Sequence, residues 1–200
     1  MLGGTFDPIH RVHLKMAYEA LNQLDLEQVW WIPAGNPWQK TRMITEAHHR
    51  FEMLKIALAH EKKFVLEPCE LLRLGPTYTL DTIHILKLRY PDVEWFLLLG
   101  NDQYQNLPTW HRWQTLLQEV QVVVFNRDLK YNLQNLQEEG LIQAEAANIP
   151  FLSLDFEPDP ISSTEIRRCA AMGYGLEQYV PIEVAKYIKQ HDLYKSFPIS

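Results

Sequence analysis

The segment GGTFDPIHRVH, from Gly3 to His13, combines residue types that suit phosphate binding. Gly3 and Gly4 have no Cβ atom, so a ligand can approach the backbone there. The apolar period after His13 predicts a helix, whose start offers free N–H groups and the positive end of the helix dipole. We expect His10 and His13 to project from this first turn toward the same phosphates, as donors or cations.

The same segment also has a purely structural interpretation, a strand-to-helix turn with an Asp-Pro bend and two surface histidines. It contains neither the GxGxxG pattern of dinucleotide-binding proteins nor the GxxxxGKS/T pattern of phosphate loops. Zinc binding by His10 and His13 is disfavoured, because no third ligand stands at a suitable spacing. We therefore predict no metal site formed by protein ligands alone.

A second segment, ISSTEIRR at 161–168, groups hydrogen-bond donors at the predicted start of another helix. Its hydroxyl side chains belong to Ser162, Ser163 and Thr164. Arg167 adds a planar cation that can bind a phosphate through two hydrogen bonds. Taken alone, the segment is better explained as a helix cap, with Glu165 and Ser162 forming a capping box.

The presence of both segments in one chain favours the functional interpretation, because two anion sites suit a triphosphate. This interpretation requires that the opening turn and the serine-rich segment converge in space. We therefore expect Thr5 and Arg167 to share one cavity.

The pattern of apolar residues predicts the elements that position these segments. Helices are expected at 13–24, 46–60 and 79–90, and from about 162 to 194 with breaks at Gly173, Gly175 and Pro181. Strands are expected at 29–33, 64–68, 93–100, 120–126 and 149–155. The alternation predicts an α/β fold with a doubly wound parallel sheet, in which ligands bind beyond the carboxyl ends of the strands. We expect a single domain over 1–200, with a helical C-terminal portion from about 162.

Composition excludes several classes of function. The formal net charge of -6 disfavours broad nucleic-acid binding, which needs a basic surface. No apolar run approaches the roughly 20 residues of a membrane span, and no charged-then-apolar leader opens the chain. Cys69 and Cys169 form no CxxC pair, so neither a disulfide framework nor a zinc knuckle is indicated. We expect a soluble, cytoplasmic protein that binds small anionic ligands, while the sequence does not reveal its oligomeric state.

The motifs GGTFDPIHxxH and ISSTxIR together resemble the nucleotidyltransferase superfamily with the HxGH motif. Further segments extend the resemblance over nearly the full chain, to bacterial nicotinate-nucleotide adenylyltransferases. These segments are PAGNPWQK, HHRFEML, GPTYTLDTI, LLLGNDQYQNLPTWHRW and VPIEVAKYI. The resemblance implies a Rossmann-like nucleotidyltransferase fold. It also implies adenylyl transfer from ATP to nicotinate mononucleotide, which gives nicotinate adenine dinucleotide and pyrophosphate in NAD biosynthesis.

The resemblance further implies roles for particular residues. The catalytic donors or cations would be His10, His13, Lys40 and Arg167, with Mg²⁺ held mainly by the ATP phosphates and water. ATP would contact Gly3, Gly4, Thr5, Phe6, His10, His13, Gly100, Asp102, Asn126, Arg127, Ser162, Ser163, Thr164 and Arg167. Nicotinate mononucleotide would contact Lys40, Tyr78, Thr79 and Trp110. Without the resemblance, Asp102 is equally well explained as a helix cap, and His48, His49 and His111 are interpreted as structural or surface residues.

Two departures from the family pattern carry their own expectations. The family has glycine where this chain has Val12, and we expect valine to occupy space at the helix start, to strain any left-handed backbone there and to weaken ATP binding. Only Met1 and Leu2 precede Gly3, where family members enter the turn from a strand of several residues. The start is therefore expected to be truncated or wrongly assigned.

Alternative functions stay open at this point. The chain could be another adenylyltransferase of the superfamily, acting on nicotinamide mononucleotide or on phosphopantetheine. It could also be a nucleotide-binding protein whose catalysis is impaired by Val12 and the short start. A nucleic-acid module is disfavoured by the acidic balance.

Overall fold

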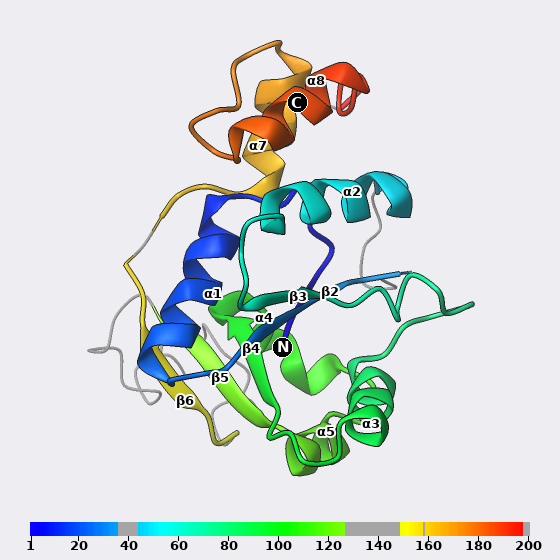
Figure 1. The fold of residues 1–200 in the computed structure, drawn as a ribbon, viewed down its shortest axis with the longest axis vertical. Helices are drawn as coiled ribbons and strands as arrows, with labels where there is room; N and C mark the ends of the chain where they lie inside the picture. The colour runs from blue at the N-terminus through cyan, green and yellow to red at the C-terminus, as the bar shows by residue number, and fades with distance from the viewer. Residues whose placement is uncertain (36–43, 127–148, 158, 198–200) are drawn as a thin grey trace.

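The computed structural model describes residues 1–35, 44–126, 149–157 and 159–197, and it has a parallel sheet at its centre (Figure 1). The strands in the described part of the chain are ordered β3-β2-β1-β4-β5-β6, and every neighbouring pair is parallel. They are β1 (Leu2–Gly4), β2 (Val29–Pro33), β3 (Phe64–Leu66), β4 (Phe96–Gly100), β5 (Gln121–Asn126) and β6 (Leu152–Asp155). The predicted doubly wound α/β fold is confirmed.

Helices connect the strands and cover the sheet. They are α1 (Arg11–Gln23), α2 (Ala47–Leu58), α3 (Thr79–Arg89), α4 (Asn101–Asn106), the 3-10 helix η1 (Leu107–Thr109), α5 (Trp113–Glu119), α7 (Ser163–Ala171) and α8 (Ile182–Gln190). The sequence did not predict α4, η1 or α5, because such short helices contain too few turns to establish an apolar period. None of the described helices is long and apolar enough to cross a membrane.

Strand β4 shows why the central strands are continuously apolar. Leu97 and Leu99 belong to the core on the side of α3 and α5, whereas Leu98 belongs to the core on the side of α1 and α2. Successive side chains of a strand point to opposite faces, so a strand covered on both faces is apolar at every position.

Strand β1 is short but central. Leu2 lies in register with Trp31 of β2 on one side and with Leu98 of β4 on the other. The backbone N–H of Leu98 also donates to the oxygen of Met1 over 3.0 Å. The order of the strands reverses between β1 and β4, which makes their carboxyl ends the expected place for a ligand.

The C-terminal helices lie at the same end of the molecule as the start of α1, beside α2 (Figure 1). One contact between α2 and α8 joins His49 Nδ1 to the Tyr187 hydroxyl over 2.8 Å. This arrangement brings the serine-rich segment at the start of α7 back to the opening turn.

Candidate functional site

A cavity of about 780 Å³ opens at the carboxyl ends of β1 and β4. Most of the residues predicted for the site line it. These are Gly3, Gly4, Thr5, Phe6, His13, Tyr78, Thr79, Gly100, Asp102, Trp110, Ser163, Thr164 and Arg167. The expectation that Thr5 and Arg167 share one cavity is therefore met, and the cavity lies at the switch point of the sheet.

Other predicted residues do not line the cavity or cannot be placed. His10 lies beside it, and its backbone N–H donates to the lining residue His13. Ser162 is the N-cap of α7 and directly precedes the lining residue Ser163. Lys40 and Arg127 lie outside the described residues, as does the side chain of Asn126 at the end of β5.

The opening turn presents its backbone to the cavity. A Cβ atom built on Gly3 would meet no atom within 4 Å, so this position opens into the cavity itself. A Cβ atom on Gly4 would come within 3.0 Å of the Phe6 ring, which packs edge-on against His13 at 5.1 Å. Phe6 has a left-handed φ of 49°, so the chain turns sharply between β1 and α1.

His10 and His13 occupy different positions in the N-terminal cap of α1. His10 is the N-cap, and its backbone N–H donates to Nδ1 of His13 over 3.2 Å. His13 thus accepts the hydrogen bond that a glutamate accepts in a capping box. Because Nδ1 is an acceptor, the neutral His13 ring carries its proton on Nε2, and Nε2 is the donor that remains.

Both rings are neutral at neutral pH. They stack 3.7 Å apart, and only 5% of His10 is exposed. Burial lowers the pKa of His10 to about 4, with an opposing and smaller effect of the Asp159 charge. Burial holds the pKa of His13 well below its usual range, and the charge that His10 carries when protonated lowers this pKa further. In the free protein these histidines are donors rather than cations, so the positive charge of the described cavity comes from Arg167.

Val12 occupies the second position of α1. It is absent from the residues with positive φ, so the left-handed backbone that would strain valine does not occur at this position. Its side chain is also absent from the described lining of the cavity. A helical backbone at this position accepts valine with only its ordinary propensity cost.

The start of α7 is fixed against the opening turn. Ser162 is the N-cap and accepts a hydrogen bond from the Glu165 N–H over 3.2 Å. Ser163 Oγ donates to the backbone oxygen of Pro8 over 3.1 Å. Arg167 is buried, with only 3% of the residue exposed. Nη1 of its guanidinium donates to the Asp7 backbone oxygen over 2.6 Å. The segment is therefore both a helix cap and a wall of the cavity.

Arg50 is a residue that the sequence analysis missed. It is buried in α2 and donates to the backbone oxygens of Thr5 at 3.0 Å and Ala34 at 2.8 Å. It also donates to the backbone oxygens of Thr45 at 2.9 Å and Gly35 at 3.4 Å. Arg50 thereby ties the opening turn to the end of β2. The only feature of the sequence that could have pointed to Arg50 was its place within the HHRFEML segment.

The opposite wall of the cavity begins at α3. Tyr78 is the N-cap of α3, and its ring stacks on His111 at 4.2 Å with an interplanar angle of 26°. His111 lines the cavity as well, although the sequence suggested only a surface or core role. Trp110 lines the cavity and also packs against the core on the side of α3.

Glu70 and Asp102 are the carboxylates near this wall. Glu70 is buried and accepts a hydrogen bond from Thr82 Oγ1 over 2.7 Å, and burial raises the pKa of its carboxyl group. Asp102 is exposed in the first turn of α4, after Gly100, which is the N-cap. The N-cap interpretation of Asp102 is therefore wrong by two positions.

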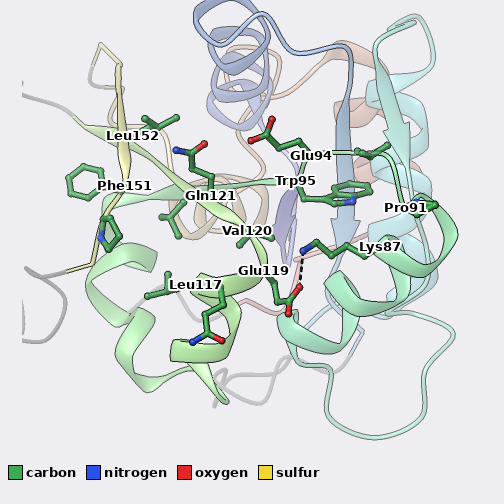
Figure 2. Close-up of a pocket in the computed structure, with 14 residues that line it drawn as sticks. Lys87, Pro91, Glu94, Trp95, Leu117, Glu119, Val120, Gln121, Phe151 and Leu152 are labelled. Carbon is green, nitrogen blue, oxygen red and sulfur yellow. Dashed lines mark hydrogen bonds and ion pairs between the residues drawn. The ribbon is translucent and has the colours of Figure 1, made fainter.

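Figure 2 shows a second cavity, of about 600 Å³, at the amino ends of β4, β5 and β6. Its lining includes Trp95, Gln121 and Leu152. Lys87 and Glu119 also line it and form an ion pair, with Nζ and Oε2 2.7 Å apart. None of the residues predicted for the site lines this cavity. The cavity between β1 and β4 is thus the candidate site.

Comparison with known families assigns the chain to one of them. The model of the cytidylyltransferase-like family matches residues 1–169, which include β1, the opening turn and most of α7. The chain belongs to this family. Residues from both walls of the cavity lie within the matched region.

Curated relatives place the chain more narrowly within the cytidylyltransferase-like family. A protein of Methylibium petroleiphilum named "probable nicotinate-nucleotide adenylyltransferase" is 39% identical over 198 residues, covering 97% of this chain and 91% of the relative. A protein of Bordetella petrii with the same name is 36% identical, covering 98% of this chain and 97% of the relative. The resemblance inferred from the sequence motifs is confirmed: the chain is a member of the nicotinate-nucleotide adenylyltransferase family.

A solved structure confirms the fold. Nicotinic acid mononucleotide adenylyltransferase of Plasmodium falciparum, complexed with NaAD, superposes with a TM-score of 0.77 at 20% identity. The superposition covers 100% of this chain and 97% of the other. The expected Rossmann-like nucleotidyltransferase fold of the cytidylyltransferase-like family is present.

Proposed function

We propose that this protein transfers the adenylyl group of ATP to nicotinate mononucleotide, giving nicotinate adenine dinucleotide and pyrophosphate. The observation that carries this proposal is that Thr5, on the glycine-rich turn, and Arg167, on α7, line one cavity at the switch point of the sheet. The names of the full-length relatives support the choice of substrates.

The reaction asks little covalent chemistry of the protein. A phosphate oxygen of nicotinate mononucleotide attacks the α-phosphorus of ATP, and the bond from that phosphorus to the bridging oxygen of the β-phosphate breaks. The electron pair of that bond leaves with pyrophosphate. The attacking phosphate is already ionised, so no general base is required. The site must hold two polyanions in line and stabilise charge on the leaving group.

The ATP side is assigned to the two segments that meet at the cavity. Gly3 and Gly4 let the nucleotide approach the backbone, and the free N–H groups of α1 and α7 face phosphate oxygens. His13 donates from Nε2 and Arg167 from its guanidinium to the phosphates. His10 orients His13 by stacking and through its backbone N–H, and Ser162 caps α7. Two anionic phosphates approaching His13 favour its protonated form, so substrate binding raises the pKa of this ring.

The remaining predicted contacts follow the family resemblance. Asp102 and Gly100 line the cavity. We assign Asp102 to accept hydrogen bonds from ribose hydroxyls, and Gly100 to let the nucleotide pass close to the end of β4. Thr164 and Ser163 add hydroxyl donors on the phosphate side. Lys40, Asn126 and Arg127 remain proposed contacts whose side chains lie outside the described residues.

The pyridine side is assigned to the wall at α3. The backbone N–H groups at the start of α3, near Tyr78 and Thr79, suit the carboxylate of nicotinate, because a helix start favours an anion. Trp110 offers a flat face to the pyridine ring. The stacked ring of His111 holds Tyr78 in place.

Mg²⁺ fits this site as a partner of the ATP phosphates. Of the carboxylates in the described cavity lining, Asp7 and Glu70 are engaged by Tyr194 and Thr82, whereas Asp102 is exposed. Such a donor set suits an ion bound mainly by phosphate oxygens and water. The ion would neutralise phosphate charge.

Pyrophosphate release with ATP and nicotinate mononucleotide, in the presence of Mg²⁺, tests the proposal. We expect release that depends on both substrates, with a higher kcat/KM for the acid mononucleotide than for the amide. A preference for nicotinamide mononucleotide or phosphopantetheine would assign the chain to another adenylyltransferase activity. ATP binding without pyrophosphate release from any of these acceptors would identify a nucleotide-binding protein with impaired catalysis.

A further inference from the structure

Residues 192–197, which we call the C-terminal clasp, follow α8 and return to the opening turn. The hydroxyl of Tyr194 donates to Oδ1 of Asp7 over 2.9 Å, across 187 positions of the chain. The Phe197 ring lies with its centroid 4.6 Å from Cζ of Arg167. Neither aromatic residue belongs to a motif that predicted the site, and neither is part of the described cavity lining.

Asp7 is the point where three parts of the chain meet. Only 1% of this residue is exposed. Its Oδ1 accepts from the clasp, and its Oδ2 accepts from the backbone N–H of Thr45, 3.5 Å away and ahead of α2. Its backbone oxygen accepts from Arg167. A buried carboxylate is stable only where donors surround it, so these donors fix the position of the opening turn.

Tyr194 is a donor across the neutral pH range. Burial, together with the charge of Asp7, raises the pKa of its hydroxyl well above the usual value. Its backbone has a φ of 68°, a left-handed conformation that is uncommon for a bulky residue. The Phe197 N–H donates to the Tyr194 backbone oxygen over 2.9 Å and closes the clasp. Such a conformation persists only where surrounding contacts determine it.

The contacts on Arg167 complete the connection. Its guanidinium donates to Asp7 from Nη1 and to Thr164 Oγ1 from Nη2 over 3.0 Å, while the Phe197 ring lies against it. An arginine side chain has several rotamers, and ordering them on ligand binding costs free energy. A guanidinium that is already held by Asp7 and Phe197 has less conformational freedom to lose when phosphate binds.

We propose that Tyr194 is a positioning residue of the ATP site, and that the clasp holds Asp7 and Arg167 in the geometry that binds phosphate. The proposal rests on the proposed function and adds that residues 192–197 help to set the affinity for ATP. Tyr194 acts through Asp7, and Phe197 acts through Arg167. The mononucleotide side, at Tyr78 and Trp110, receives no direct contact from the clasp.

Tyr194→Phe tests the proposal with a minimal change, because the ring stays and only the hydroxyl is lost. We expect the KM for ATP to rise about fivefold to tenfold, as the loss of one hydrogen bond to a charged group predicts. The KM for nicotinate mononucleotide is expected to stay within about twofold. Tyr174→Phe is the matched control, because Tyr174 is 64% exposed on the connection between α7 and α8, and both KM values should be unchanged.

A second variant and a mutant cycle separate positioning from general stability. Phe197→Leu keeps apolar volume but removes the ring from Arg167, and should also raise the KM for ATP selectively. Tyr194→Phe and Asp7→Ala should be strongly non-additive in ATP affinity, because each removes one partner of the same hydrogen bond. Equal changes in both KM values, or an unchanged KM for ATP in both clasp variants, would overturn the proposal.

Calorimetric titration with ATP distinguishes this proposal from the proposed function. A wild-type protein that binds ATP but releases no pyrophosphate would refute adenylyl transfer. The ratio of the ATP affinities of the wild type and Tyr194→Phe would still test whether the clasp supports ATP binding. A reduced affinity of the variant supports the clasp, and an equal affinity refutes it. A wild-type protein that binds no ATP would refute both proposals.

Discussion

Nη1 of Arg167 donates a 2.6 Å hydrogen bond to the backbone oxygen of Asp7, joining residues that are 160 positions apart. This bond connects the two segments from which an ATP site was predicted. The cavity therefore exists only when the first turn of the chain and the start of α7 have come together. Substitutions near this contact are expected to separate effects on binding from effects on folding.

Arg167→Lys is expected to lower kcat/KM for ATP by about two orders of magnitude. Lysine keeps the positive charge, but it cannot bond to Asp7, Thr164 and a phosphate at the same time with a fixed fork of donors. Pyrophosphate release measures the effect. Arg168→Lys is the control, because Arg168 lies on the same helix and pairs with Glu165 at the surface. A loss below threefold in Arg167→Lys would contradict the assigned role.

Arg50→Met is expected to reduce the free energy of unfolding by about 3 kcal/mol or more. The variant keeps an apolar stem but removes the donor from buried backbone oxygens, among them those of Thr5 and Ala34. Urea denaturation measures the loss. Lys55→Met on the same helix is exposed and should change stability by less than about 0.5 kcal/mol. Equal stability of the two variants would show that Arg50 does not anchor the turn.

Gly3→Ala is expected to weaken ATP binding at least fivefold without reducing stability. The added methyl group meets no protein atom within 4 Å, yet it enters the cavity where the nucleotide would approach. Calorimetry and thermal unfolding measure the two effects. Gly4→Ala is the contrasting variant, because its Cβ would lie 3.0 Å from the Phe6 ring and should also lower stability. Undiminished ATP affinity in Gly3→Ala would place the ligand elsewhere.

Stability should fall as the pH is lowered from 7 toward 4. The pKa of His10 is about 4 in the folded protein and 6.5 in the unfolded chain, so the unfolded state binds more protons between these values. The contribution of His10 is fully present above pH 6.5 and is lost as the pH falls, by roughly 3 kcal/mol at most. Urea denaturation at several pH values measures how the free energy of unfolding depends on pH. His10→Gln should reduce the loss of stability between pH 7 and pH 4, and an unchanged loss would refute the prediction.

Val12→Gly tests the departure from the family pattern. Because Val12 is helical and does not line the described cavity, we now expect ATP affinity to change by less than about twofold. The free energy of unfolding should decrease by about 0.5–1 kcal/mol, since glycine in a helix is less favourable than residues with a side chain. A much tighter binding of ATP by the glycine variant would restore the view that valine obstructs the nucleotide.

The sequence alone determined the succession of the main strands and helices along the chain. Apolar runs such as the one in β4 predicted strands covered on both faces, and the parallel sheet follows from their alternation with helices. The same patterns missed α4 and α5, because the two helices have too few residues to display a period. The two segments that we propose to bind phosphate were also identified from the sequence, since residue types and helix starts are local properties.

Only the tertiary structure decided how these segments cooperate. The neutral state of His10 and His13 depends on burial, which no local pattern measures. The contacts of Arg50 with the opening turn and of Tyr194 with Asp7 join distant parts of the chain. A sequence reveals periodicity and local chemistry because these act between neighbours in the chain, whereas burial and long-range hydrogen bonds exist only after the chain has folded.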